Sequence, residues 1–175
     1  NAVAFLSGVI THSQNRDRRV ASAAGQALCR VCSSHSKVVW SAPDALRDAI
    51  AAVSMGGDES ACSVVEGVAR AASHVSVDVA ANTCTPLVDG LKVCVETAIN
   101  AVDVDAKVRA FKRVVHALQL CDTCASFSPA QLRQQLAVQI MPILSACHAP
   151  PLALDEVVVG SALRCHASAT LKEDP

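Results

Sequence analysis

Apolar residues recur along most of this chain at intervals of three and four positions, the spacing of one face of an α-helix. Residues 59–75 carry Ala61, Val64, Val65, Val68 and Ala72, and residues 104–121 carry Val104, Val108, Phe111, Val115 and Leu118. No segment shows the strict alternation of a half-buried strand. The pattern predicts eight helical segments, near residues 2–12, 17–35, 43–55, 59–75, 78–101, 104–121, 129–147 and 153–171.

Polar residues at the predicted helix starts support these boundaries. Asp58 and Asp103 are suitable N-caps, because a carboxylate accepts hydrogen bonds from the free backbone N–H groups of the first turn. Ser128, followed by Pro129 and Gln131, predicts a further cap with a first-turn proline and a capping box.

The predicted helices also repeat at a regular distance. Those that begin near residues 17, 59, 104 and 153 lie about 42 to 49 residues apart, close to the period of HEAT and armadillo repeats. We therefore expect an all-α fold, a right-handed α-solenoid of about four HEAT-type helix pairs. Residues 1–175 would form a single solenoid block, and the start of the chain inside an apolar segment suggests a fragment of a longer array.

Composition agrees with helices packed closely on helices. The chain is 51% hydrophobic but only 2% aromatic, so its core must consist of Ala, Val, Leu, Ile and Cys rather than the aromatic residues common in β-sandwiches. The formal net charge of −1 is far from the basic excess of a nucleic-acid-binding domain. No uninterrupted apolar run is long enough to span a bilayer. We expect neither nucleic acid nor membrane as a direct partner.

Two Cys-x-x-Cys pairs, Cys29/Cys32 and Cys121/Cys124, raise the question of thiol or metal chemistry. A reactive pair normally lies at a helix N-terminus, where the helix dipole lowers the thiol pKa. Cys29 instead lies about three turns inside its predicted helix, and the second pair lies near a helix C-terminus. Structural zinc needs four ligands; His35 would add a third to the first pair, and no fourth is evident.

The helix near 17–35 explains the first pair as packing residues. On a helical wheel it has two buried faces and one polar wedge, as expected for a helix with neighbours on two sides. The larger apolar face consists of Val20, Ala24, Ala27, Leu28 and Val31, and the second face of the small residues Ala21, Gly25, Cys29 and Cys32. We expect the cysteines of both Cys-x-x-Cys pairs to be reduced and metal-free, and to serve as small core residues.

Sequence motifs of common catalytic sites are absent. The chain has no GxGxxG, Walker, HExxH or GxSxG motif. Its six histidines are scattered, mostly near predicted helix ends or outer faces, without paired carboxylates. We therefore predict a protein that is not an enzyme, with no catalytic residue, cofactor or metal.

Four stretches, in order, resemble helices of the importin-β superfamily of karyopherins, in its transportin-SR and importin-thirteen branch. They are RRVASAAGQALCRVCSSHS, SACSVVEGVARAASHVSVD, LAVQIMPILSAC and VVVGSALRCHASA. The resemblance implies a mid-protein HEAT-repeat block of a nuclear transport receptor that shuttles between nucleus and cytoplasm. Its partners would be protein cargo and, through the full-length receptor, a Ran-type GTPase and nucleoporins. The alternative is a HEAT or armadillo scaffold or adaptor unrelated to nuclear transport.

Exposed arginines are the candidate contact residues, since the resemblance carries no family binding residue to a numbered position. Each helix expected in the inner layer offers at least one arginine beside its apolar stripe. On the concave face they would form a basic track for acidic or phosphorylated partner segments; alternatively, they are solvated or link adjacent repeats. The candidates are Arg19, Arg30, Arg70, Arg109, Arg113 and Arg164.

Overall fold

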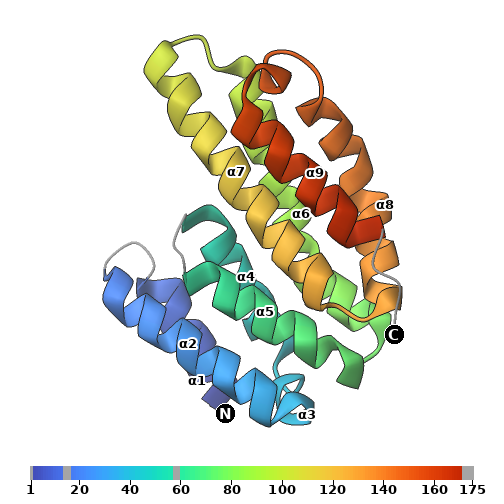
Figure 1. Ribbon diagram of the computed structural model, residues 1–175. Coiled ribbons are helices and arrows are strands. Elements are labelled where there is room, and N and C mark those ends of the chain that lie inside the picture. Colours follow the sequence, from blue (N-terminus) through green and yellow to red (C-terminus); the bar gives the residue numbers. More distant parts are fainter. Residues whose placement is uncertain (1, 14–16, 57–59, 171–175) are drawn as a thin grey trace.

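The computed structural model describes residues 2–13, 17–56 and 60–170, and within these ranges the chain is all helical, with no strand (Figure 1). The helices are α1 (Ala2–Ser13), α2 (Arg18–Ser34), α3 (Ser36–Val39), α4 (Pro43–Gly56), α5 (Ser60–Ala71), α6 (Val77–Asn100), α7 (Val104–Phe127), α8 (Ala130–Cys147) and α9 (Glu156–Thr170). Two short 3-10 segments, η1 (Ala72–His74) and η2 (Leu152–Leu154), lie between them. None of the described helices is both long and apolar enough to cross a membrane.

The predicted helical segments are confirmed, with differences in detail. The short helix α3 was not expected, and α7 continues to Phe127 instead of ending near residue 121. The cap predicted at Ser128 is wrong: Ser128 ends α7, where its N–H donates to Cys124 O at 3.0 Å, and Pro129 precedes α8. The cap at Asp103 is confirmed, since its carboxylate accepts from Ala106 N at 2.9 Å. The cap predicted at Asp58 lies outside the described residues.

The longer helices pack in two rows. In one row α1 contacts α4, α4 contacts α6 and α6 contacts α8; in the other, α2 contacts α5, α5 contacts α7 and α7 contacts α9. Across the two rows, α1 packs on α2, α4 on α5, α6 on α7 and α8 on α9. In Figure 1, α2, α5, α7 and α9 all run in the same direction, from upper left to lower right. Most of the core therefore lies between two layers of helices.

Aliphatic side chains and cysteines fill this core, as the composition predicts. The largest fully buried side chains include Ile10, Leu28, Leu91 and Leu118, and no phenylalanine is among them. The single tryptophan, Trp40, is half-buried and donates its Nε1–H to Ala71 O at 2.7 Å. This bond ties the segment after α3 to the end of α5.

The first Cys-x-x-Cys pair lies where α2 closely approaches α5 at Gly67. A Cβ added to Gly67 would lie 2.9 Å from Cys29 Cα and 3.2 Å from Cys32 Cβ. Cys32 is buried and Cys29 half-buried at this contact, so the small-residue face of α2 packs against α5 as predicted. The larger face is only partly confirmed: Ala24 and Leu28 are buried and Ala27 and Val31 half-buried, but Val20, in the first turn of α2, is 44% exposed.

Candidate functional site

All six candidate arginines lie on the row formed by α2, α5, α7 and α9, and all are exposed. Arg70 is held by structural contacts. Its Nε donates to Glu66 Oε1 at 2.9 Å, and its guanidinium lies 4.1 Å from the centre of the Phe127 ring of α7. Because α5 and α7 are neighbours in the row, Arg70 is a link between them.

The other arginines are not gathered at one place. Arg164 donates to Ser161 Oγ on its own helix at 3.0 Å. Arg19 lines a shallow depression on α2, together with Arg18. Arg30 and Arg109 are exposed on α2 and α7. The arginines are thus separate exposed cations along one row of helices. That they bind a partner stays a prediction.

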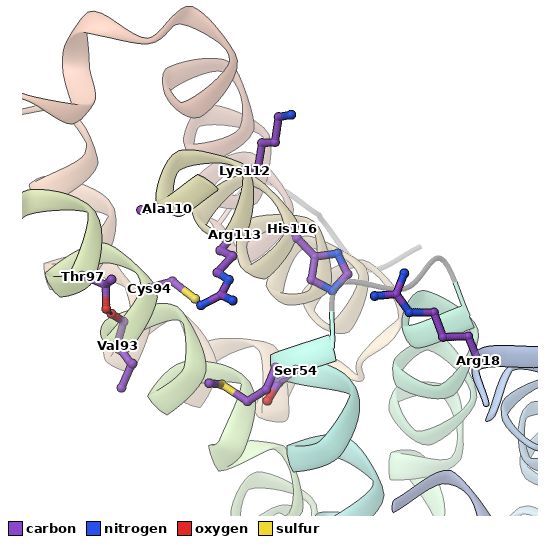
Figure 2. Close-up of a pocket in the computed structure, with 10 residues that line it drawn as sticks. Arg18, Ser54, Val93, Cys94, Thr97, Ala110, Lys112, Arg113 and His116 are labelled. Carbon is purple, nitrogen blue, oxygen red and sulfur yellow. Dashed lines mark hydrogen bonds between the residues drawn. The ribbon is translucent and has the colours of Figure 1, made fainter. Parts of the chain in front are cut away.

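Arg113 differs from these, because it lines a cavity of about 340 Å³ at the junction of α2, α4, α6 and α7. Figure 2 shows its guanidinium directed between α7 and α6, toward Cys94. Arg18 reaches the same cavity from the start of α2, and His116 reaches it from α7. Lys112 of α7 also contributes to the lining, but Figure 2 shows its amino group directed away from Arg113. The remaining lining residues are Ser54, Met55, Val93, Cys94, Thr97 and Ala110.

The cavity is suited to an anion. Its described lining holds Arg18, Lys112 and Arg113 but no carboxylate, and none of these three side chains makes a hydrogen bond or ion pair within the described part of the chain. Guanidinium groups with free donors favour carboxylate or phosphate oxygens. The cavity's two hydroxyl side chains, Ser54 and Thr97, already donate to backbone carbonyls, at 2.9 and 2.7 Å. The basic side chains are therefore the main hydrogen-bond donors available to a ligand.

Cys94 is a poor nucleophile in this setting. Burial raises the pKa of the Cys94 thiol, and the nearby Arg113 lowers it by a smaller amount. The thiolate is the reactive form of cysteine, so Cys94 is held mainly as the neutral thiol at neutral pH. Cys94 therefore does not supply a reactive thiolate to the cavity.

Sequence reasoning found only Arg113 of this cavity, and it missed the other three basic lining residues, Arg18, Lys112 and His116. The signal for two of them was present in the run KVRAFKRVVH, which concentrates basic side chains on the first half of α7. His116 was expected at a helix end or outer face, but it lies half-buried in the cavity wall, well inside α7. Arg18 joins the cavity from another helix, which the sequence pattern alone does not indicate.

The cysteines of the second pair belong to the core. Cys121 and Cys124 are buried in α7; Cys121 Sγ lies 3.8 Å from Leu87 O, and Cys124 Sγ lies 3.8 Å from Cys84 Sγ of α6. Contact with the Cys124 thiol, together with burial, raises the pKa of Cys84. None of the nine cysteines, all of which lie in the described residues, forms a disulfide. Within residues 2–13, 17–56 and 60–170, no group of three or more His, Cys, Asp or Glu side chains is placed to hold a metal ion.

Buried thiols should resist alkylation in the folded protein. Burial raises the pKa of both Cys32 and Cys165 to about 12 and that of Cys147 to about 11, so almost none of each is thiolate at pH 8. With iodoacetamide at pH 8, we expect mass spectrometry to show modification of half-buried Cys29 well before these three. In urea all nine should react at similar rates. Modification of native Cys165 as fast as in urea would contradict this assignment.

Comparison of the chain with protein-family models, curated proteins and solved structures finds no match. The class that the fold defines is that of all-helical proteins whose helices pack against one another. A more specific function must be argued from the residues of the chain itself.

Proposed function

We propose that this chain is a block of a right-handed α-solenoid and serves as a non-catalytic binding scaffold. Its HEAT-type pairs would be α1/α2, α4/α5, α6/α7 and α8/α9. The observation that carries the proposal is the order of contacts. The first helix of each pair contacts the first helix of the next pair, and the second helix contacts the second helix of the next pair. Stacked repeats contact mainly their neighbours in this way, and such arrays provide extended binding surfaces.

The binding surface in this proposal is the row formed by α2, α5, α7 and α9. It carries all six candidate arginines and contributes every cationic side chain of the Arg113 cavity. Exposed guanidinium groups without fixed partners suit acidic or phosphorylated segments of a partner protein. Arg70 and Arg164 are exceptions, because Glu66 and Phe127 already occupy the guanidinium of Arg70, and Arg164 donates to Ser161 Oγ on its own helix.

The setting we propose for the scaffold is a nuclear transport receptor. The four stretches that resemble karyopherin helices support it, and in the structure they fall on α2, on α5 with the segment that follows it, on α8 and on α9. The intact receptor would carry protein cargo through the nuclear pore, contact nucleoporins and respond to a Ran-type GTPase.

A pull-down with the intact protein tests this setting. We expect a Ran-type GTPase loaded with a non-hydrolysable GTP analogue to be retained, and the GDP-loaded form to be retained much less. Equal retention of both forms, or of neither, would favour a HEAT or armadillo scaffold outside nuclear transport. Neither outcome decides whether the exposed arginines of α2, α5, α7 and α9 bind an acidic partner, which is tested separately.

Charge reversal on α7 should weaken binding of an acidic partner. For Arg109→Glu with Arg113→Glu, we expect roughly tenfold or greater loss of affinity for a Glu-rich peptide lacking apolar residues, because attraction becomes repulsion. Fluorescence anisotropy at low salt would measure it, and screening should reduce the difference at high salt. The control is Arg47→Glu with Lys92→Glu, the same charge change at exposed sites on α4 and α6. Equal affinity for the two double variants would remove the basic surface from the proposal.

A further inference from the structure

An apolar groove of about 540 Å³ lies between the first half of α7 and the start of α9. The two helices pack side by side in the second row, and the groove follows their contact. Its apolar walls are valines from both helices and one aromatic ring. The lining residues are Val104, Lys107, Val108, Phe111, Lys112, Val115, Asp155 and Val157.

The apolar walls of the groove are unusually open to solvent. Val104 is 73% exposed, Val108 50% and Val157 61%. Leu154, which lies beside Asp155 at the start of α9, is 80% exposed. Single exposed apolar residues are common, but a contiguous concave set typically marks an interaction surface.

Charge at the groove specifies the kind of partner. Lys107 and Lys112 are the cationic lining residues, and neither makes an ion pair in the described part of the chain. Asp155 is the one acid of the lining, and its Oδ1 accepts from Val157 N and Val158 N at 2.9 and 3.0 Å. Asp155 keeps its negative charge while it caps α9, so Lys107 and Lys112 leave the lining with a net positive charge. An acidic partner complements them.

The shape of the groove specifies the form of the partner. Val104, Val108, Phe111 and Val115 are spaced as one face of α7, and at 1.5 Å per residue this stripe is about 16 Å long. A helix of about three turns matches that length, and an amphipathic helix buries its apolar face in such a groove. We propose that the α7/α9 groove binds an amphipathic α-helix of a partner protein, with acidic residues flanking the apolar stripe of that helix.

This inference does not rest on the proposed transport function. It uses the α7/α9 contact, whereas the Arg113 cavity lies between α7 and the helices α2, α4 and α6. Lys112 lines both sites, but Lys107 lines only the groove. Variants at Lys107 and at the valines therefore test the groove separately from the basic cavity.

Three synthetic helical peptides of about 14 residues, roughly four turns, test the proposal on the complete chain. All share one leucine stripe, and their polar positions are Glu, Gln or Lys. By fluorescence anisotropy we expect the Glu peptide to bind most tightly and the Lys peptide most weakly. Val108→Gln with Val157→Gln should weaken the Glu peptide roughly tenfold or more, since the buried apolar contact is lost. Lys107→Gln should reduce the preference for Glu over Lys.

The matched control is Val138→Gln on α8, where an exposed valine (76%) lies on the other row. It should leave binding unchanged, and circular dichroism checks that every variant folds. Equal binding of the three peptides, no binding of the Glu peptide, or equal effects of Val138→Gln and the double variant would overturn the proposal. So would a dimer of the chain that the Glu peptide fails to displace and that the double variant abolishes, because a second copy would then occupy the groove.

Discussion

Replacing Gly67 with leucine should destabilise the protein by about 1–3 kcal/mol or more, because α5 approaches α2 too closely for a side chain. A Cβ at Gly67 already lies 2.9 Å from the Cα of Cys29, a backbone atom that cannot rotate away. The rest of a leucine side chain would enlarge this clash. To accommodate it, α2 and α5 must separate, and the buried contact of Cys32 would be lost.

Chemical denaturation followed by circular dichroism measures this effect, with Gly8→Ala as the control. Gly8 is also inside a helix, but a Cβ there would meet nothing within 4 Å. Because alanine is a better helix former than glycine by about 1 kcal/mol, Gly8→Ala should leave stability unchanged or raise it. The stability of Gly67→Ala should lie between those of Gly67→Leu and Gly8→Ala, because overpacking by the added Cβ opposes the gain in helix propensity. An unchanged free energy of unfolding for Gly67→Leu would contradict the prediction, because it would show that the helices separate at no cost.

The helices themselves were predictable because their apolar residues follow the helical period over long segments. The differences have local causes. Helix α3 spans only Ser36–Val39, too short for a period of 3.6 to show. Helix α7 continues past Cys121 because Cys124 and Ala125 extend its buried face, and the first helix-breaking residue comes only at Pro129.

The candidate surfaces were less predictable, because periodicity shows which residues share a face and not what covers that face. Val104 and Val108 continue the same stripe as buried Leu118, yet no neighbouring helix of the described chain covers them. The Arg113 cavity likewise depends on α2 and α7 meeting at one junction, although Arg18 and Arg113 are far apart in the sequence. The order of the helices in the sequence was enough to predict that the six arginines lie on one row. Only the structure shows that they are separated from one another along that row.

A core substitution near the end of the array should distinguish a solenoid from a globule with a single cooperative core. Leu144 of α8 is 2% exposed, and α8 packs on α6, α9 and η2. Leu144→Ala should remove about 2–5 kcal/mol by leaving a cavity. In a stacked array, stability is approximately a sum of repeat and nearest-neighbour terms. Native-state hydrogen exchange should therefore show loss of protection in α8 and α9, while α1 and α2 keep theirs.

Leu28→Ala is the matched variant at the other end, since Leu28 of α2 is fully buried. It should give the reverse pattern, with protection lost in α1 and α2 and retained in α8 and α9. The two variants carry the same chemical change in the same kind of environment, so the difference between them reports position along the array. Equal acceleration of exchange in all helices by either variant would indicate one cooperative unit, and the α-solenoid proposal would then fail.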